Sequence, residues 1–114
     1  MRSPRDNTKI LARKLNALYP EASQHDKAVQ ILAEYGKGRH DKEPERVRLA
    51  ILKLSGADLG KLEHNTTRAK QDYRDVLAWA EYPGQSKNWS IMNGPQKEKL
   101  KKADLEEYEA WLME

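Results

Sequence analysis

A chain of 114 residues has the usual size of one domain, and its 21 Lys and Arg against 18 Asp and Glu leave a formal net charge of only +3. Because cysteine is absent, the composition excludes a disulfide framework, thiolate catalysis and any cysteine-based zinc site. No apolar run is long enough for a secretory signal at the N-terminus or for a bilayer span anywhere, so we expect a cytoplasmic protein with no membrane partner.

Two amphipathic helices are predicted in the N-terminal part of the chain. The first covers residues 8–18, where leucines recur along one face, and residues 1–7 are expected to be flexible. The second lies in the segment SQHDKAVQILAEYG, in which Ser23 and Asp26 resemble a capping box and apolar residues recur at helical spacing. Gly36 then suits the left-handed position that follows a helix end.

The most apolar helix is predicted over residues 44–55. Pro44 fits the first turn of a helix, and Gly56 fits its end. Only two basic residues interrupt the apolar run from Val47 to Leu54, so apolar side chains cover most of the helix circumference. A helix of this kind is buried on nearly all sides, and the prediction therefore places it at the centre of the fold.

A longer amphipathic helix is predicted from about Asp58 to Tyr82. The stretch HNTT, residues 64–67, supplies mediocre helix formers, so a bend is expected there. The dipeptide Pro83-Gly84 ends the helix and begins an irregular loop over residues 83–94.

Residues 95–114 form a C-terminal helical segment with an uneven charge distribution. Residues 97–102 hold four Lys and one Glu, whereas residues 104–114 hold one Asp and four Glu. One continuous helix would oppose the macrodipole, so this order predicts a break near Ala103, with Asp104 capping a second helix. The whole pattern predicts an all-α, single-domain bundle of five or six helices over residues 1–114, built around the central apolar helix.

Residues that could carry catalysis or bind a metal are few. His25, His40 and His64 lie in separate segments, and no two of them occupy positions i and i+4 of a predicted helix. The serines lie at helix ends or in loops, outside the strand-turn-helix setting of a nucleophile elbow. The sequence therefore predicts a protein that is not an enzyme and that uses no cofactor or metal.

Basic residues gather in two clusters, residues 1–14 with five bases and one acid, and residues 37–53 with six bases and three acids. The segment YGKGRH in the second cluster has glycines that could let backbone N–H groups converge on an anion, although a helix end with a linker is the simpler interpretation. The candidate anion contacts are Lys37, Arg39, Arg46 and Arg48. Weak, nonspecific association with nucleic acid is therefore an alternative function, whereas pairing of Arg46 and Arg48 with acids of the 58–82 helix would be structural.

Aromatic residues are concentrated around the segment DYRDVLAWAEYPG and in the tail. One interpretation is structural, with Trp79 and Tyr82 covering the core beneath the loop that holds Trp89. The other is an exposed patch that binds a protein partner, because aromatic residues are enriched at the centres of interfaces. This candidate interaction surface comprises Trp79, Tyr82, Trp89, Tyr108 and Trp111. Its partner would be another protein or a second copy, with a homodimer forming through the C-terminal segment.

The segments EPERVRLAILKLSGADLGKLE and DYRDVLAWAEYP, together with the tail DLEEYEAWL, resemble segments shared by a family of short, uncharacterised bacterial proteins. The resemblance covers about half of the chain. It implies a bacterial helical protein, and it implies no activity, cofactor or site residue.

Overall fold

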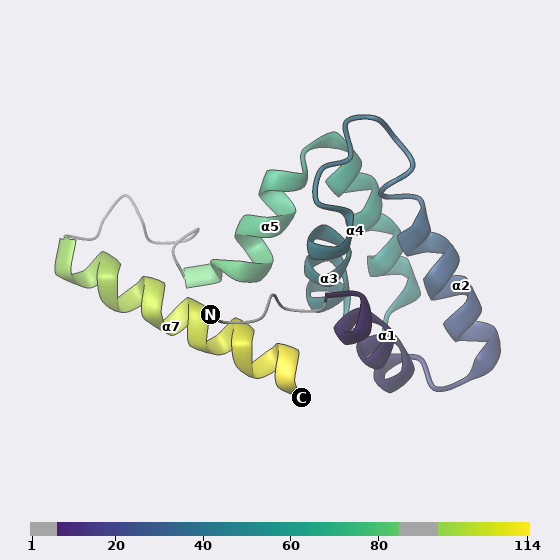
Figure 1. Cartoon of the computed structure of the whole chain (residues 1–114), viewed down its shortest axis with the longest axis horizontal. Helices are drawn as coiled ribbons and strands as arrows, with labels where there is room; N and C mark the ends of the chain where they lie inside the picture. The colour runs from purple at the N-terminus through teal and green to yellow at the C-terminus, as the bar shows by residue number, and fades with distance from the viewer. Residues whose placement is uncertain (1–6, 85–93) are drawn as a thin grey trace.

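Six helices form in the parts of the chain that the computed structural model describes, residues 7–84 and 94–114 (Figure 1). In chain order they are α1 (Asn7–Leu18), α2 (Ala22–Ala33), α3 (Pro44–Ser55), α4 (Leu59–Gln71), α5 (Tyr73–Glu81) and α7 (Gly94–Met113). No strand occurs in these ranges, so the predicted all-α class is confirmed. The expectations for residues 1–6 and 85–93, Trp89 among them, lie outside the described residues.

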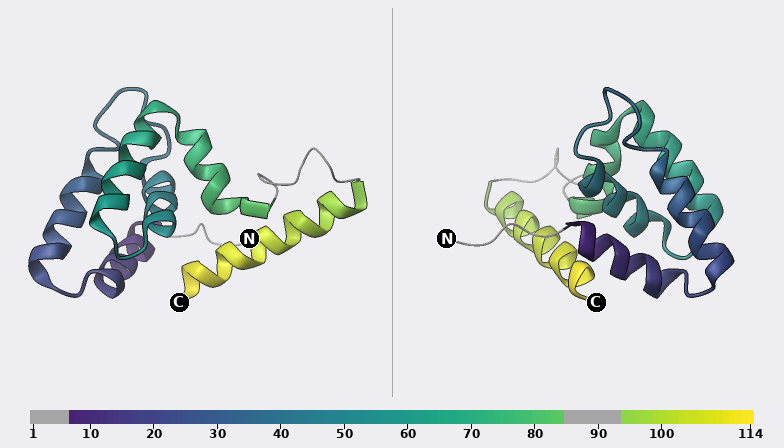
Figure 2. Two further views of the ribbon diagram at one scale, coloured as in Figure 1. Left: turned by 180° about the vertical axis from the view of Figure 1, so that it is seen from behind. Right: turned by 45° about the vertical axis from the view of Figure 1, so that its right-hand side comes forward.

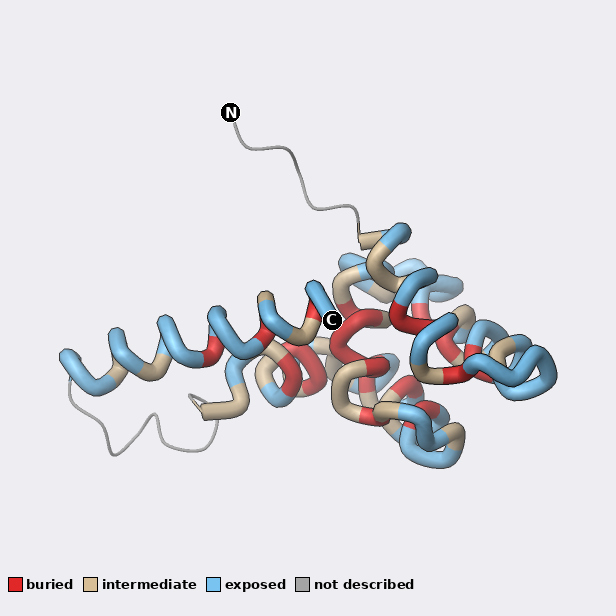
Figure 3. The backbone as a smooth tube through the Cα atoms, turned by 90° about the horizontal axis from the view of Figure 1, so that it is seen from below, coloured by how far each residue is buried: buried red, intermediate tan, exposed pale blue. Residues whose placement is uncertain are grey.

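Helix α3 lies at the centre of the fold, as its apolar sequence predicted. Val47, Ala50, Ile51 and Leu52 are fully buried, and α3 packs against α1, α4 and α5. The buried positions in Figure 3 accordingly gather where these helices meet. The helix ends at Gly56, which has a φ of 58°, in the left-handed region that glycine adopts without strain.

The predicted single helix over residues 58–82 is wrong, because the chain breaks at Asp72 into α4 and α5. Asp72 has extended φ and ψ angles of −156° and 99°, and its carboxylate accepts a hydrogen bond of 3.1 Å from the N–H of Arg74. This side chain caps the start of α5 and so stabilises the break. At residues 64–67, where a bend was expected, α4 continues without a break, and the Thr66 hydroxyl donates a hydrogen bond to the carbonyl of Leu62.

The start of α2 also differs from the prediction. The helix begins at Ala22, so its N-cap residue is Glu21 rather than Ser23. The Ser23 hydroxyl donates to the Glu21 carboxylate over 2.7 Å instead of capping the helix. At the other end, Gly36 has a φ of 110°, which confirms the expected left-handed glycine.

Helix α7 is one continuous helix, so the predicted break near Ala103 is wrong. Asp104 does not cap a new helix: it is 3% exposed, and its carboxylate accepts a hydrogen bond from the N–H of Gly84. The carbonyl of Leu112, near the C-terminal end, accepts from the guanidinium of Arg13. The Arg13 contact supplies a favourable positive charge at the C-terminal end of α7, where the sequence itself places acids.

The packing of α7 is uneven along its length. Its C-terminal half lies against α1, α3 and α5, while its N-terminal half extends away from the other helices, as both views in Figure 2 show. The buried residues of α7 are Asp104, Tyr108 and Leu112. Leu49 of α3 completes a small second core with the last two.

Candidate functional site

A cleft of about 190 Å³ lies between the end of α5 and the middle of α7. We call it the α5–α7 cleft. Its lining residues come from three helices and from the residue that follows α5; they are Arg46, Glu81, Tyr82, Leu105, Tyr108 and Glu109. The cleft thus contains two of the five aromatic residues that the sequence pointed to.

Two large apolar side chains beside this cleft are exposed to solvent. Tyr82 is 42% exposed and Leu105 is 60% exposed, whereas Tyr108 is buried. Tyr82 follows the last residue of α5 with φ and ψ angles of −130° and 50°, where the helical path ends. Leu105 follows the buried Asp104 and therefore lies on a neighbouring, unburied side of α7. The two side chains together present an apolar surface built from two separate helices.

The charged edge of the cleft is held by an ion pair. The Arg46 guanidinium donates two hydrogen bonds to the Glu81 carboxylate, of 2.9 Å and 2.6 Å, and also lies 3.0 Å from Glu43. The hydrogen bond to Glu81 raises the pKa of Arg46 despite the opposing effect of burial. The Glu81 side chain is only 11% exposed, so this bidentate pair is a fixed feature. It also confirms the predicted pairing of Arg46 with an acid of residues 58–82.

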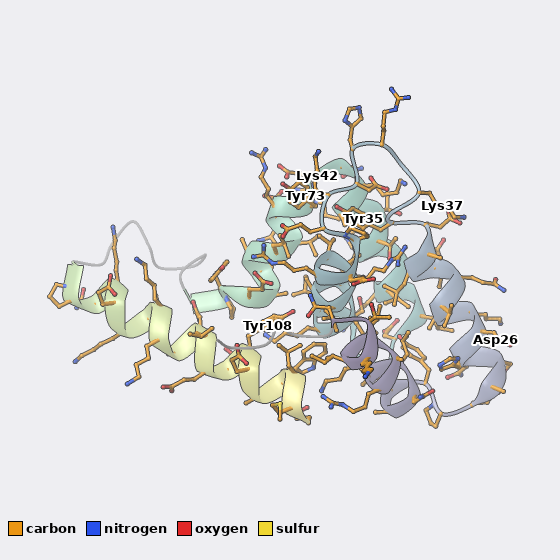
Figure 4. The ribbon with its side chains drawn as sticks, viewed as in Figure 1. Asp26, Tyr35, Lys37, Lys42, Tyr73 and Tyr108 are labelled. Carbon is orange, nitrogen blue, oxygen red and sulfur yellow. The ribbon has the colours of Figure 1, made fainter. Side chains whose placement is uncertain are left out.

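The position of α7 beside the cleft depends on a close approach at Gly84. A Cβ atom added to Gly84 would lie 2.5 Å from a methyl carbon of Leu100 and 2.9 Å from a carboxylate oxygen of Asp104. Only glycine leaves room for its N–H to meet Asp104. Tyr108 points from α7 toward the body of the protein (Figure 4), and the Lys53 ammonium lies 5.9 Å from its ring centre.

Of the remaining aromatic candidates, Trp79 lies away from the cleft, whereas the ring centre of Trp111 lies 6.0 Å from that of Tyr108. Trp79 is 42% exposed and faces α4, where the Arg68 guanidinium lies 5.6 Å from the ring centre. Trp111 is half-buried against α1, with the Lys14 ammonium 4.4 Å from its ring centre. Tyr82 and Tyr108 therefore line one cleft, which Trp79 and Trp111 do not line, although Trp111 packs on Tyr108.

Sequence reasoning missed the apolar residue Leu105 of this site, together with the lining acids Glu81 and Glu109. The neighbours of Leu105 at positions 104, 106 and 107 are all acidic, so it looked like an isolated apolar residue in a charged tail. The available signal was that Leu105 falls off the helical stripe formed by Tyr108 and Leu112.

The anion site suggested by YGKGRH is occupied by a side chain of the protein itself. The N–H groups of Gly36 and Gly38 both donate to one carboxylate oxygen of Asp41, over 2.9 Å and 3.0 Å. Burial would raise the pKa of Asp41, but these hydrogen bonds and that of Lys70 outweigh burial and lower it. The hydroxyl of Tyr35 donates to the carbonyl of Lys42, and Figure 4 shows these residues together at this loop.

The candidate anion contacts have different roles in the structure. Lys37 pairs with Glu34 over 2.8 Å on the surface. The predicted pairing of Arg48 with an acid of residues 58–82 is wrong. The Arg48 guanidinium instead donates to the carbonyls of Leu32 and Tyr35. Among the described residues, no hydrogen bond or ion pair involves Arg39.

Several basic side chains stabilise helix C-termini instead of facing a ligand. Arg48 reaches the end of α2, Lys70 reaches the Glu34 carbonyl just after it, and Lys53 reaches the Ala80 carbonyl of α5. Arg13 does the same for α7. The C-terminal end of a helix carries partial negative charge, so these basic side chains have a structural role in stabilising the helices.

Other cavities contain few groups that converge. His40 lines a cavity of about 410 Å³ with Lys70 and Arg74, and His64 lines one of about 300 Å³ with Arg68. Within residues 7–84 and 94–114, no group of three or more His, Cys, Asp or Glu side chains is placed to hold a metal ion. No helix in those ranges is both long and apolar enough to cross a membrane.

No family model, curated protein or solved structure matches this chain. The resemblance to a bacterial family therefore stays a prediction, and the function has to be argued from the site.

Proposed function

We propose that the protein is a protein-interaction module that binds its partner at the α5–α7 cleft. The observation that carries this proposal is the exposure of Tyr82 and Leu105 on either side of one cleft. The proposal assigns the chain a binding role and no reaction. The cysteine-free sequence is compatible with a cytoplasmic location for such a role.

The composition of the cleft supports binding to a protein. Protein interfaces have apolar and aromatic residues at the centre and polar or charged residues at the rim. Here Tyr82, Leu105 and the edge of Tyr108 supply the centre, while the Arg46–Glu81 pair and Glu109 supply the rim. A tyrosine in such a position can contribute about 2 kcal/mol to binding.

The supports of the cleft favour binding further, because they fix its shape before a partner arrives. The Arg46–Glu81 pair holds α3 against α5, and the Gly84–Asp104 hydrogen bond holds the end of α5 against α7. A surface that is already ordered loses less conformational entropy on association than a flexible one.

Site-specific photo-crosslinking in the cells that normally express the protein tests the proposal. We expect a crosslinking amino acid at position 105 to give discrete protein adducts, and Tyr82→Ala in the same chain to reduce them. Val29 is the matched control position, because it is an apolar residue of α2 with 41% exposure. No adduct at position 105, or the same adducts at position 29, would contradict the proposal.

Weak, nonspecific association with nucleic acid through residues 1–14 and 37–53 is the alternative. Its support is reduced because Arg46 and Arg48 are already bonded within the protein. Titration with duplex DNA and RNA at two salt concentrations tests it. Affinity that falls steeply with salt and also falls in Arg39→Ala would favour this alternative over the α5–α7 cleft.

A further inference from the structure

We propose that the partner at the α5–α7 cleft is a second copy of this chain, bound with the two α7 helices antiparallel about a two-fold axis near Leu105. This inference rests on the proposed function, because it names the partner of the same surface. Its basis is the placement of charges along α7.

The charges of α7 change sign close to the middle of the helix. The four lysines of residues 97–102 lie in its N-terminal half, and the four acids of residues 104–113 lie in its C-terminal half. Leu105 stands next to this boundary and is 60% exposed. A two-fold axis at this residue would place the basic half of each helix beside the acidic half of the other.

The spacing around Leu105 defines the closest pairs. Lys101 lies four residues before Leu105 and Glu109 lies four residues after it, so all three share one side of the helix. In an antiparallel pair centred on Leu105, Lys101 of each copy faces Glu109 of the other. A parallel pair in the same register would instead place like charges opposite each other, so electrostatics favours the antiparallel arrangement.

The structure of the single chain is compatible with this exchange of partners. Lys101 and Glu109 both already interact with other residues of their own chain, so the dimer would exchange these interactions for contacts between chains. One of them is the pair of Lys101 with Glu98 over 3.4 Å, whose side chains are 50% and 75% exposed, so this pair costs little to give up. The N-terminal half of α7 extends away from the other described helices (Figure 3). The same two-fold contact brings Tyr82 of each copy toward the lysine-rich half of the other.

The contact is self-complementary, which is the condition for a closed dimer rather than an open chain of copies. Leu105 and Tyr82 would lose their exposure to water, and the charges would fix the register and orientation. Because the ion pairs lie at the surface, salt screens them and the dimer should weaken as ionic strength rises.

Sedimentation velocity of the full chain over a range of concentrations and at two salt concentrations measures this association. We expect a monomer–dimer equilibrium with a dissociation constant that rises with salt. Lys101→Glu or Glu109→Lys should each weaken the dimer about tenfold or more, because two attractive pairs become two repulsive pairs. Lys27→Glu, an exposed charge reversal on α2, is the matched control and should leave the equilibrium unchanged.

Two rescue experiments separate this arrangement from a structural effect of the variants. The double variant with both changes should dimerise again, because the pairs are restored with their signs exchanged. A mixture of Lys101→Glu chains with Glu109→Lys chains should form a heterodimer, since both of its facing pairs are then attractive. Residues 101 and 109 are two turns apart within one chain, so a rescue has to come from contacts between chains.

The outcomes divide as follows. A chain that stays monomeric at all concentrations, or a dimer that ignores both charge reversals, would overturn the inference, as would a mixture that fails to pair. If the chain is monomeric while position 105 still crosslinks to a different protein, the proposed function stands and only the identity of the partner is wrong. If neither association is found, both are wrong.

Discussion

Replacement of Leu112 by alanine is expected to loosen α7 from the body of the protein and to lower the free energy of unfolding by about 2–3 kcal/mol. Leu112 is 2% exposed and packs with Leu49 and Tyr108 in the small core beneath α7. A buried Leu→Ala change costs about 2–5 kcal/mol, depending on how far the surroundings collapse into the space. We expect the lower part of this range because the partly buried neighbours Ile10 and Trp111 can move into the space.

Urea denaturation followed by circular dichroism measures this loss, and hydrogen exchange locates it in the chain. If the amides of α7 exchange by undocking of the helix, the same 2–3 kcal/mol should speed their exchange about 30- to 140-fold. Met113→Ala is the control, because this neighbouring side chain is 75% exposed and its loss should change stability by less than about 0.5 kcal/mol.

Two results would refute this reasoning. Equal effects of Leu112→Ala and Met113→Ala would mean that burial of one side of α7 does not hold the helix in place. Rapid exchange throughout α7 in the unchanged protein would mean that the helix is not stably docked at all.

Arg46→Ala should lower the free energy of unfolding by about 1.5–3 kcal/mol, because it removes two charge-assisted hydrogen bonds and leaves the Glu81 carboxylate buried without them; a loss below about 0.5 kcal/mol in urea denaturation would contradict this. Gly36→Ala should lower the free energy of unfolding by about 1–3 kcal/mol, since φ is 110° and the new Cβ would lie 2.6 Å from a guanidinium nitrogen of Arg48. Gly94→Ala, with nothing within 4 Å of its Cβ, should be neutral or slightly stabilising in the same assay. The lowered pKa of Asp41 stabilises the fold above the unfolded-state pKa of about 3.9, and this stability is lost as pH falls through the folded-state pKa. From pH 7 to pH 3, the melting temperature should therefore fall less in Asp41→Asn than in the unchanged protein. An equal fall in both proteins would show that this carboxylate is not responsible.

The helices themselves could be predicted from sequence because their causes are local. Apolar residues all around the α3 segment require burial wherever the helix is placed, and that is what the structure shows. Pro44, Gly56 and Gly36 act through their own backbone preferences, so their positions at helix ends followed directly from residue type.

Helix breaks were harder to predict, because one residue type can act in two ways. Asp72 and Asp104 are both acids that follow a helical pattern, and either could cap a new helix. Asp72 does so through the nearby N–H of Arg74, whereas Asp104 bonds to Gly84, which is 20 residues away in the chain. Only the packing of α7 against the end of α5 decides between these outcomes.

The site shows the same division between local and tertiary causes. Sequence alone determined an all-α fold with α3 at its centre and singled out Tyr82 and Tyr108, because helical spacing and aromatic composition are visible in the order of residues. Tertiary structure decided that these two lie together with Leu105, that Trp79 lies against α4, and that Trp111 packs on Tyr108 without lining the cleft. It also decided that Arg48 bonds to backbone carbonyls. Exposure and hydrogen-bond partners depend on which surfaces the packed helices cover, and that is fixed by contacts between residues far apart in the chain.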